Sequence, residues 1–171
     1  CFGHPILPSY HFDKAKTIVS INADFITNWI VPTKYSVDYG STRKPENVWM
    51  SRHYQFESVL SLTGSNADYR GQIKPSQEGE TALALLNELK GKAHDSSLSE
   101  KTLKLIQKAA KDLKANMGSS LVVSGSNNKD AQVLVNAIND YLGNYGHTID
   151  LATPLHLFNG DDAKVEQLVN D

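Results

Sequence analysis

The sequence predicts an α/β domain with a mostly parallel sheet, arranged in three layers as a Rossmann-like domain. Short β-branched runs alternate along the chain with segments in which apolar residues recur every three or four positions. Strands that alternate with helices favour parallel pairing, because each helix returns the chain to the same end of the sheet. Right-handed crossovers then place helices over the faces of the sheet.

Length and composition agree with one globular domain. The chain has 171 residues, 40% of them hydrophobic, and a net charge of −2. A chain of this length buries enough apolar surface for one core. The charge gives no general electrostatic reason to bind nucleic acid. No apolar run approaches the ~20 residues that cross a bilayer, so we expect no direct membrane span.

The chain begins with Cys1 rather than Met, which favours a fragment of a longer protein; a mature lipoprotein is the alternative. One Cys forms no internal disulfide and does not supply the four thiolates of an iron–sulfur cluster. We expect residues 1–12 to form an extended lead-in. Residues 13–171 are then predicted to form a single Rossmann-like domain.

Five short runs have the composition of strands. Most are apolar or β-branched and are bounded by turn-forming residues. They are Thr17–Ile21, Val48–Met50, Tyr69–Lys74, Leu121–Val123 and Thr148–Leu151. The stretch between His53 and Asp68 is rich in Ser, Thr, Gly and Asn and receives no firm assignment.

Helices are predicted between these strands. Pro32 suits the first turn of one helix, and Ser76 is the predicted N-cap of the next, which stops before Gly91. Ser97 and Glu100 have capping-box spacing ahead of a third helix. Two more helices are expected over residues 128–142 and 163–169.

Candidate ligand-binding residues follow the predicted strands. In an open parallel sheet, ligands bind beyond the carboxyl ends of the strands, where loops present backbone N–H groups and helix N-termini. The loops after the first, second and fourth predicted strands carry polar residues. The candidates for cofactor binding are Asn22, Asp24, Arg52, Gly125, Ser126 and Asn127.

Each candidate has a structural alternative. Asn127 or Asn128 would simply cap the following helix, and Asn22 and Asp24 would stabilise a turn through side-chain hydrogen bonds. Arg52 would form a surface pair with the adjacent His53. The glycine-rich nucleotide-binding motifs are absent from the sequence, as are a nucleophile elbow and paired His residues at helical spacing. We therefore expect no catalytic residue and no metal site in this chain.

One helix carries a basic flank beside its apolar stripe. The flank comprises Lys101, Lys104, Lys108, Lys111 and Lys114. A solvated helix face accounts for such a pattern, and a docking face for an acidic partner is the alternative.

Several segments, taken in order, match one family pattern. They are Asp13–Phe25, Met50–Tyr54, Ser61–Arg70, Ile73–Ser76 and Leu142–Gly146. Together they resemble the molybdopterin oxidoreductase superfamily. The resemblance is closest to the large iron–sulfur subunit of alternative complex III, a membrane-bound quinol-oxidising assembly.

The resemblance implies a Rossmann-like piece of that subunit with altered ligand loops. In members that carry molybdenum, the second strand ends in Asp-Pro-Arg and the third is followed by Pro-Gly-Thr-Asp. The matching positions here are Met50–Arg52 and Pro75–Glu78. The missing Asp removes an acceptor for a guanine edge, and Ser76 in place of Gly hinders close backbone approach to a ligand.

The resemblance therefore implies a non-catalytic scaffold domain, inactive by itself, without a cofactor of its own. Iron–sulfur clusters would be held elsewhere in the parent subunit. Its partners would be other domains of that subunit and redox subunits such as a cytochrome c. The implied location is the periplasmic face of the inner membrane, as a peripheral component. The main alternative is a true molybdenum oxidoreductase, in which these loops bind a molybdopterin guanine dinucleotide. A free-standing nucleotide-binding module is a third hypothesis.

Overall fold

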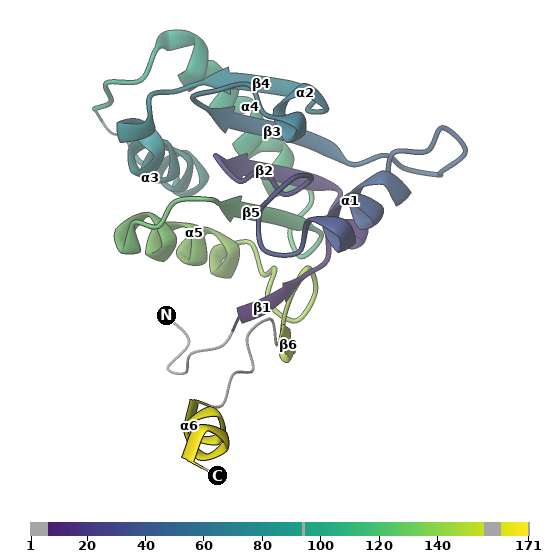
Figure 1. The fold of residues 1–171 in the computed structure, drawn as a ribbon. Helices are drawn as coiled ribbons and strands as arrows, with labels where there is room; N and C mark the ends of the chain where they lie inside the picture. Colours follow the sequence, from purple (N-terminus) through teal and green to yellow (C-terminus); the bar gives the residue numbers. More distant parts are fainter. Residues whose placement is uncertain (1–6, 94, 156–161, 171) are drawn as a thin grey trace.

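Four parallel strands form the main sheet, in the order β4-β3-β2-β5. The computed structural model describes residues 7–93, 95–155 and 162–170 (Figure 1). The strands are β2 (Thr17–Ile21), β3 (Arg52–Glu57), β4 (Tyr69–Gln72) and β5 (Ser120–Ser124). The predicted α/β class with a parallel sheet is confirmed.

Helices cover both faces of the main sheet, which gives the predicted three layers. Three long helices lie on one face: α3 (Glu78–Lys90), α4 (Glu100–Ala115) and α5 (Lys129–Tyr141). The opposite face carries η1 (Phe12–Lys14), α1 (Pro32–Ser41) and the short α2 (Leu62–Ser65). Figure 1 shows α1 across the sheet from α3 and α5. A terminal helix, α6 (Asp162–Asn170), agrees with the predicted one.

The sheet separates two hydrophobic cores. Side chains alternate between the faces of a strand, so Val19 of β2 faces the core under α3, α4 and α5, whereas Ile18 faces the core under α1. In β5, Val122 and Val123 divide in the same way. Because both faces of the sheet are covered, β2 and β5 are buried along their whole length and mostly apolar in their middle, and both were recognisable in the sequence.

The predicted strand Val48–Met50 is wrong. The strand in this region is β3, and both ends of the predicted run are exposed: Val48 fully and Met50 by 53%. The true strand alternates Tyr54 and Phe56 with polar residues that are nonetheless buried. Its composition therefore resembles that of a half-exposed segment.

Part of the predicted extended lead-in, residues 1–6, lies outside the described residues. Within the rest, Leu7–Tyr10 form β1, which pairs antiparallel with β6 (Ile149–Leu155) in a separate two-stranded sheet. The last predicted strand is thus present but does not join the main sheet. This pairing joins residues about 140 positions apart, which local sequence patterns do not indicate.

Two predicted helix caps lie one or two residues from the observed ones. Gln77, not Ser76, is the N-cap of α3, because a 3-10 turn, η2 (Pro75–Gln77), precedes the helix. Ser99, not Ser97, caps α4 and accepts from the N–H of Thr102 at 3.2 Å. At the other end of α3, Gly91 adopts a left-handed φ of 66°, as the predicted C-cap requires.

Candidate functional site

The carboxyl ends of β2, β3 and β5 meet at one edge of the main sheet, because the three strands are parallel and in register. We call the loops that follow them the carboxyl edge: residues 22–31, 58–61 and 125–128. Five of the six predicted site residues lie here.

Asn22 links the end of β2 to the start of α3. Its backbone has a positive φ of 53°, a conformation that Asn tolerates better than most residues. The side-chain Nδ2 donates to Glu78 Oε1 at 2.7 Å, and the Asn22 N–H donates to the carbonyl of Phe56, also at 2.7 Å. Both N–H donors named here, on the side chain and on the backbone of Asn22, are therefore already bonded within the chain.

Asp24 holds α2 against the loop after β2. Its Oδ1 accepts from the N–H of Thr63 at 3.2 Å and from Thr63 Oγ1 at 2.6 Å. Its carbonyl accepts from three consecutive amides, those of residues 27–29. The structural alternative for Asn22 and Asp24 was a turn held by their side chains, but both side chains bond to distant segments, and the turn after Asp24 is held by its backbone carbonyl.

The loop after β5 packs against the loop after β2. A Cβ on Gly125 would overlap the carbonyl oxygen of Asn22, so only Gly fits at this close approach. The N–H of Ser126 donates to Ser124 Oγ at 3.1 Å, and the Ser126 carbonyl accepts from Gln132 Nε2 at 2.6 Å. The expected cradle for a ligand is thus a contact between two loops.

Asn128 is the N-cap of α5, as the structural alternative for this loop predicts. Its Oδ1 accepts from the N–H groups of Asp130 at 2.8 Å and Ala131 at 3.2 Å. These are the N–H groups that an anion at the start of the helix would use. Asn127 beside it is exposed.

Arg52 does not lie at the carboxyl edge. It is the first residue of β3, at the opposite end of the sheet, so the length of the strand, about 16 Å, separates it from the other candidates. Its guanidinium pairs with Asp112 at 2.9 Å, and Tyr54 Oη donates to the same carboxylate at 2.5 Å. Burial alone would raise the pKa of Asp112, but these two hydrogen bonds hold it below its ordinary value.

These positions test the fit of a guanine dinucleotide. One ligand would need a cation and several free N–H groups at the same edge. Here Arg52 lies at the opposite end of the strands, and the side chains of Asn22, Asp24 and Asn128 at the carboxyl edge already have partners within the chain. The six residues do not fit the group as one site.

A buried polar network on β3 has no counterpart in the sequence predictions. His53, Gln55 and Glu57 point to the same face, and each is at most 1% exposed. His53 Nε2 lies 3.2 Å from Gln55 Oε1, and Gln55 Nε2 donates to Glu57 Oε2 at 3.1 Å. Tyr39 Oη lies 3.2 Å from His53 Nδ1 at one end, and Arg70 Nε donates to Glu57 Oε1 at 2.6 Å at the other. We call these five residues the β3 polar network.

Burial and hydrogen bonds set the charges in this network. Burial lowers the pKa of His53 to about 4, so the ring is neutral at pH 7. Burial would raise the pKa of Glu57, but hydrogen bonds from Arg70 and Ser61 outweigh it and lower that pKa. Ser61 contributes both its N–H, at 3.2 Å, and its Oγ, at 2.6 Å. Glu57 is therefore a charged, fully bonded group.

α2 packs directly against the Glu57 end of the β3 polar network. A Cβ on Gly64 would overlap the Glu57 carboxylate, so the helix can approach this closely only with Gly at that position. The sequence signal was the spacing of His53, Gln55 and Glu57 by two residues, which is the period of one strand face. A polar face is ordinarily solvated, so this spacing did not indicate a buried strand.

Comparisons with known proteins add no assignment: no family model matches the chain, and no curated protein matches it. Among residues 7–93, 95–155 and 162–170, no helix is both long and apolar enough to cross a membrane. Within the same ranges, no three His, Cys, Asp or Glu side chains gather as a metal-binding group. The class established by the structure is a three-layer α/β domain with a parallel Rossmann-like sheet.

Proposed function

We propose that this chain is a non-catalytic scaffold domain. The observation that carries the proposal is the bonding at the carboxyl edge, where Asn22 is bonded to Glu78 and Asp24 to Thr63. A ligand at this edge would first have to break these bonds, and the groups left behind would lose their partners. The edge instead holds β2, α2 and α3 together.

The resemblance found in the sequence extends this proposal to a parent protein. It suggests a molybdopterin-oxidoreductase-like iron–sulfur subunit in a membrane-associated quinol-oxidising complex. The chain would supply a rigid wall beside domains that hold the clusters, and a cytochrome c is the kind of partner that would accept the electrons. Rigidity has a physical basis here, since hydrogen bonds within the β3 polar network, together with that from Ser61 to Glu57, tie β3 to α1, β4 and the N-cap of α2.

Thermal unfolding in the presence of nucleotides tests the scaffold function. The 171-residue chain is titrated with GTP, GDP and NADH while its Tm is followed. We expect no change in Tm, because a ligand that does not bind the folded state does not stabilise it. A rise of several degrees at sub-millimolar nucleotide would contradict the proposal and favour a nucleotide-binding module.

Metal and pterin analysis of the full-length parent, purified from its own cells, separates the scaffold from the molybdenum alternative. Iron without molybdenum or tungsten is the expected result. Stoichiometric molybdenum with a pterin guanine dinucleotide would overturn the scaffold proposal.

A further inference from the structure

The two outer strands of the main sheet, β4 and β5, differ in the hydrogen bonding of their free sides, which we call the β4 edge and the β5 edge. At the β5 edge, the Val122 N–H donates to Asn139 Oδ1 at 3.1 Å, and Asn139 Nδ2 donates to the Val122 carbonyl at 2.7 Å. The carbonyl of Ser120 accepts from Thr148 Oγ1 at 2.5 Å. Side chains therefore take the place of a neighbouring strand, which is one way in which proteins protect a sheet edge.

The β4 edge lacks this protection. The Ile73 N–H donates inward to the Glu57 carbonyl at 3.1 Å. Because backbone groups alternate in direction along a strand, Arg70 and Gln72 direct their N–H and C=O groups outward. Within the described residues, the contact to these outward groups is from Thr102 Oγ1 to the Gln72 carbonyl, at 3.5 Å, the long limit of a hydrogen bond.

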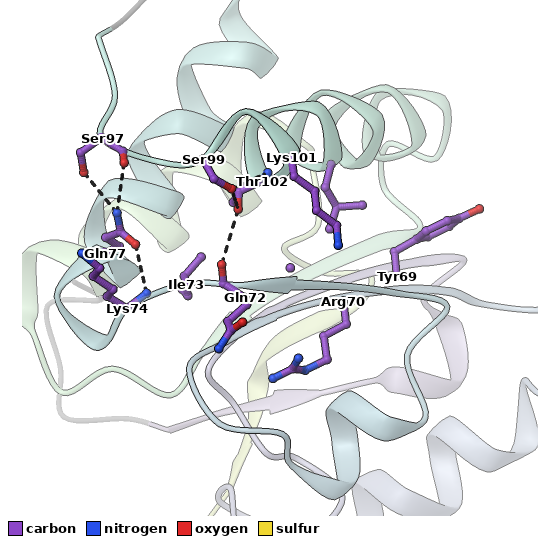
Figure 2. A pocket seen from close by; sticks show the side chains of 12 residues that line it. Tyr69, Arg70, Gln72, Ile73, Lys74, Gln77, Ser97, Ser99, Lys101 and Thr102 are labelled. Carbon is purple, nitrogen blue, oxygen red and sulfur yellow. Dashed lines mark hydrogen bonds between the residues drawn. The ribbon is translucent and has the colours of Figure 1, made fainter.

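A groove of about 770 Å³ runs beside this open edge. Six consecutive residues, Tyr69–Lys74, line one side of it, and the first turns of α4 line the other, including Lys101 and Leu105. Figure 2 shows the Lys101 side chain reaching from α4 toward β4. The groove therefore runs along the whole of β4.

The groove is basic. Arg70, Lys74 and Lys101 line it, and its lining, which lies wholly within the described residues, contains no Asp or Glu. Further along α4, Lys108 Nζ lies 3.8 Å from the centroid of the Tyr69 ring in β4. Arg70 is already paired with Glu57 at 2.6 Å, so the three lysines carry the charge that is available to a partner.

We propose that the β4 edge binds an extended acidic segment of a partner polypeptide, which adds to the main sheet as a further strand. The outward backbone groups of Arg70 and Gln72 pair with the main chain of the segment. Alternate side chains of the segment point to the α4 side, where acidic ones meet Lys101 and Lys108. The proposal goes beyond the scaffold function and does not depend on whether the carboxyl edge binds a ligand.

Peptide binding to the 171-residue chain tests the charge requirement. The probe is a fluorescent eight-residue peptide of alternating Thr and Glu, compared by anisotropy at low salt with a peptide of alternating Thr and Gln. We expect the acidic peptide to bind with a Kd below about 1 mM and roughly fivefold or more tightly than the neutral one. No binding of the acidic peptide at about 1 mM, or equal binding of both, overturns the proposal.

Charge-reversal variants locate the binding. The double variant Lys101→Glu with Lys108→Glu is expected to weaken acidic-peptide binding by roughly fivefold or more. A control with the same change in net charge, Lys90→Glu with Lys129→Glu on α3 and α5, is expected to weaken it much less. Equal losses in both double variants would show a general charge effect and contradict a site at β4.

A proline variant tests strand addition. Gln72→Pro removes an outward N–H that bonds to no strand, so the fold tolerates it at an edge, whereas peptide binding is lost. Gln72→Ala keeps the N–H and is expected to bind normally. In the unmutated chain, the amides of Arg70 and Gln72 are expected to exchange more slowly when the peptide is present. Equal binding by the two variants, or unchanged exchange, would rule out a new strand.

Discussion

Asn22 and Glu78 are joined by a 2.7 Å hydrogen bond from Asn22 Nδ2 to Glu78 Oε1, which connects the end of β2 to the first residue of α3. In a parallel sheet this is the place where a ligand would contact both a strand end and a helix N-terminus. Here two side chains of the same chain occupy it. The contact is consistent with a carboxyl edge whose polar side chains stabilise the fold and do not bind a ligand.

Gly64 is expected to be intolerant of any side chain. Gly64→Ala places a Cβ against the Glu57 carboxylate, and such overpacking costs about 1–3 kcal/mol of unfolding free energy. Gly40→Ala is the matched control, because its Cβ meets nothing within 4 Å inside α1. That change is expected to be neutral or to stabilise by up to about 1 kcal/mol. Urea unfolding measures both, and an equal effect of the two variants would contradict close packing of α2 on Glu57.

Loss of the Arg70–Glu57 ion pair is expected to destabilise the fold strongly. Arg70→Ala leaves the buried Glu57 carboxylate without its cation, which costs roughly 3 kcal/mol. Lys104→Ala removes the exposed pair with Glu100 and is expected to cost less than about 1 kcal/mol. Chemical denaturation compares them. Similar small losses would mean that water, rather than Arg70, compensates Glu57.

His53 is expected to make stability fall as the pH falls. Its pKa is about 4 in the folded chain against an ordinary 6.5, so between these pH values the unfolded chain binds a proton that the folded chain does not. Stability therefore declines by up to about 3 kcal/mol from pH 6.5 to pH 4, and this contribution then levels off. Glu57 and Asp112, whose pKa values are lowered, contribute a further loss below the ordinary carboxyl range.

Unfolding curves measured from pH 7 to pH 4.5 test this expectation. His53→Leu lowers the overall stability, since it removes the partner of Gln55 Oε1, but it is expected to flatten the dependence of stability on pH between pH 5 and pH 6.5. A slope that persists in His53→Leu would assign the effect to another group.

Asn139 is expected to protect the β5 edge. Asn139→Ala leaves the buried N–H and C=O of Val122 without partners, at a cost of about 2–3 kcal/mol. The exposed Asn127→Ala change is expected to stay within about 0.5 kcal/mol of zero. Hydrogen exchange provides a second readout, because the Val122 amide should lose protection in the first variant alone.

The sequence identified the parts of the fold whose residues carry a local signal. Thr17–Ile21 was recognisable because both faces of a central parallel strand are buried and apolar, and Asn128 because N-caps have a narrow residue preference. β3 was missed because the buried His53, Gln55 and Glu57 bond to one another and to partners such as Tyr39 and Arg70. Those partners come from α1 and β4, which no local pattern connects to β3.

The candidate site shows the same limit. Placing Arg52 beside Asn22 followed from the wrong strand, since Arg52 begins β3 instead of following a strand. The residues of the carboxyl edge were placed correctly by topology alone. Their bonding to Glu78 and Thr63 depends on α3 and α2 and was not visible in the sequence.

A crystal structure of the chain grown with a large excess of GDP is the sharpest test of a carboxyl edge that binds no nucleotide. We expect Asn22 Nδ2 within hydrogen-bonding distance of Glu78 Oε1, Asp24 bonded to Thr63, and no nucleotide at the carboxyl edge. Ordered guanine density there, with Asn22 turned away from Glu78 to contact it, would overturn the scaffold proposal.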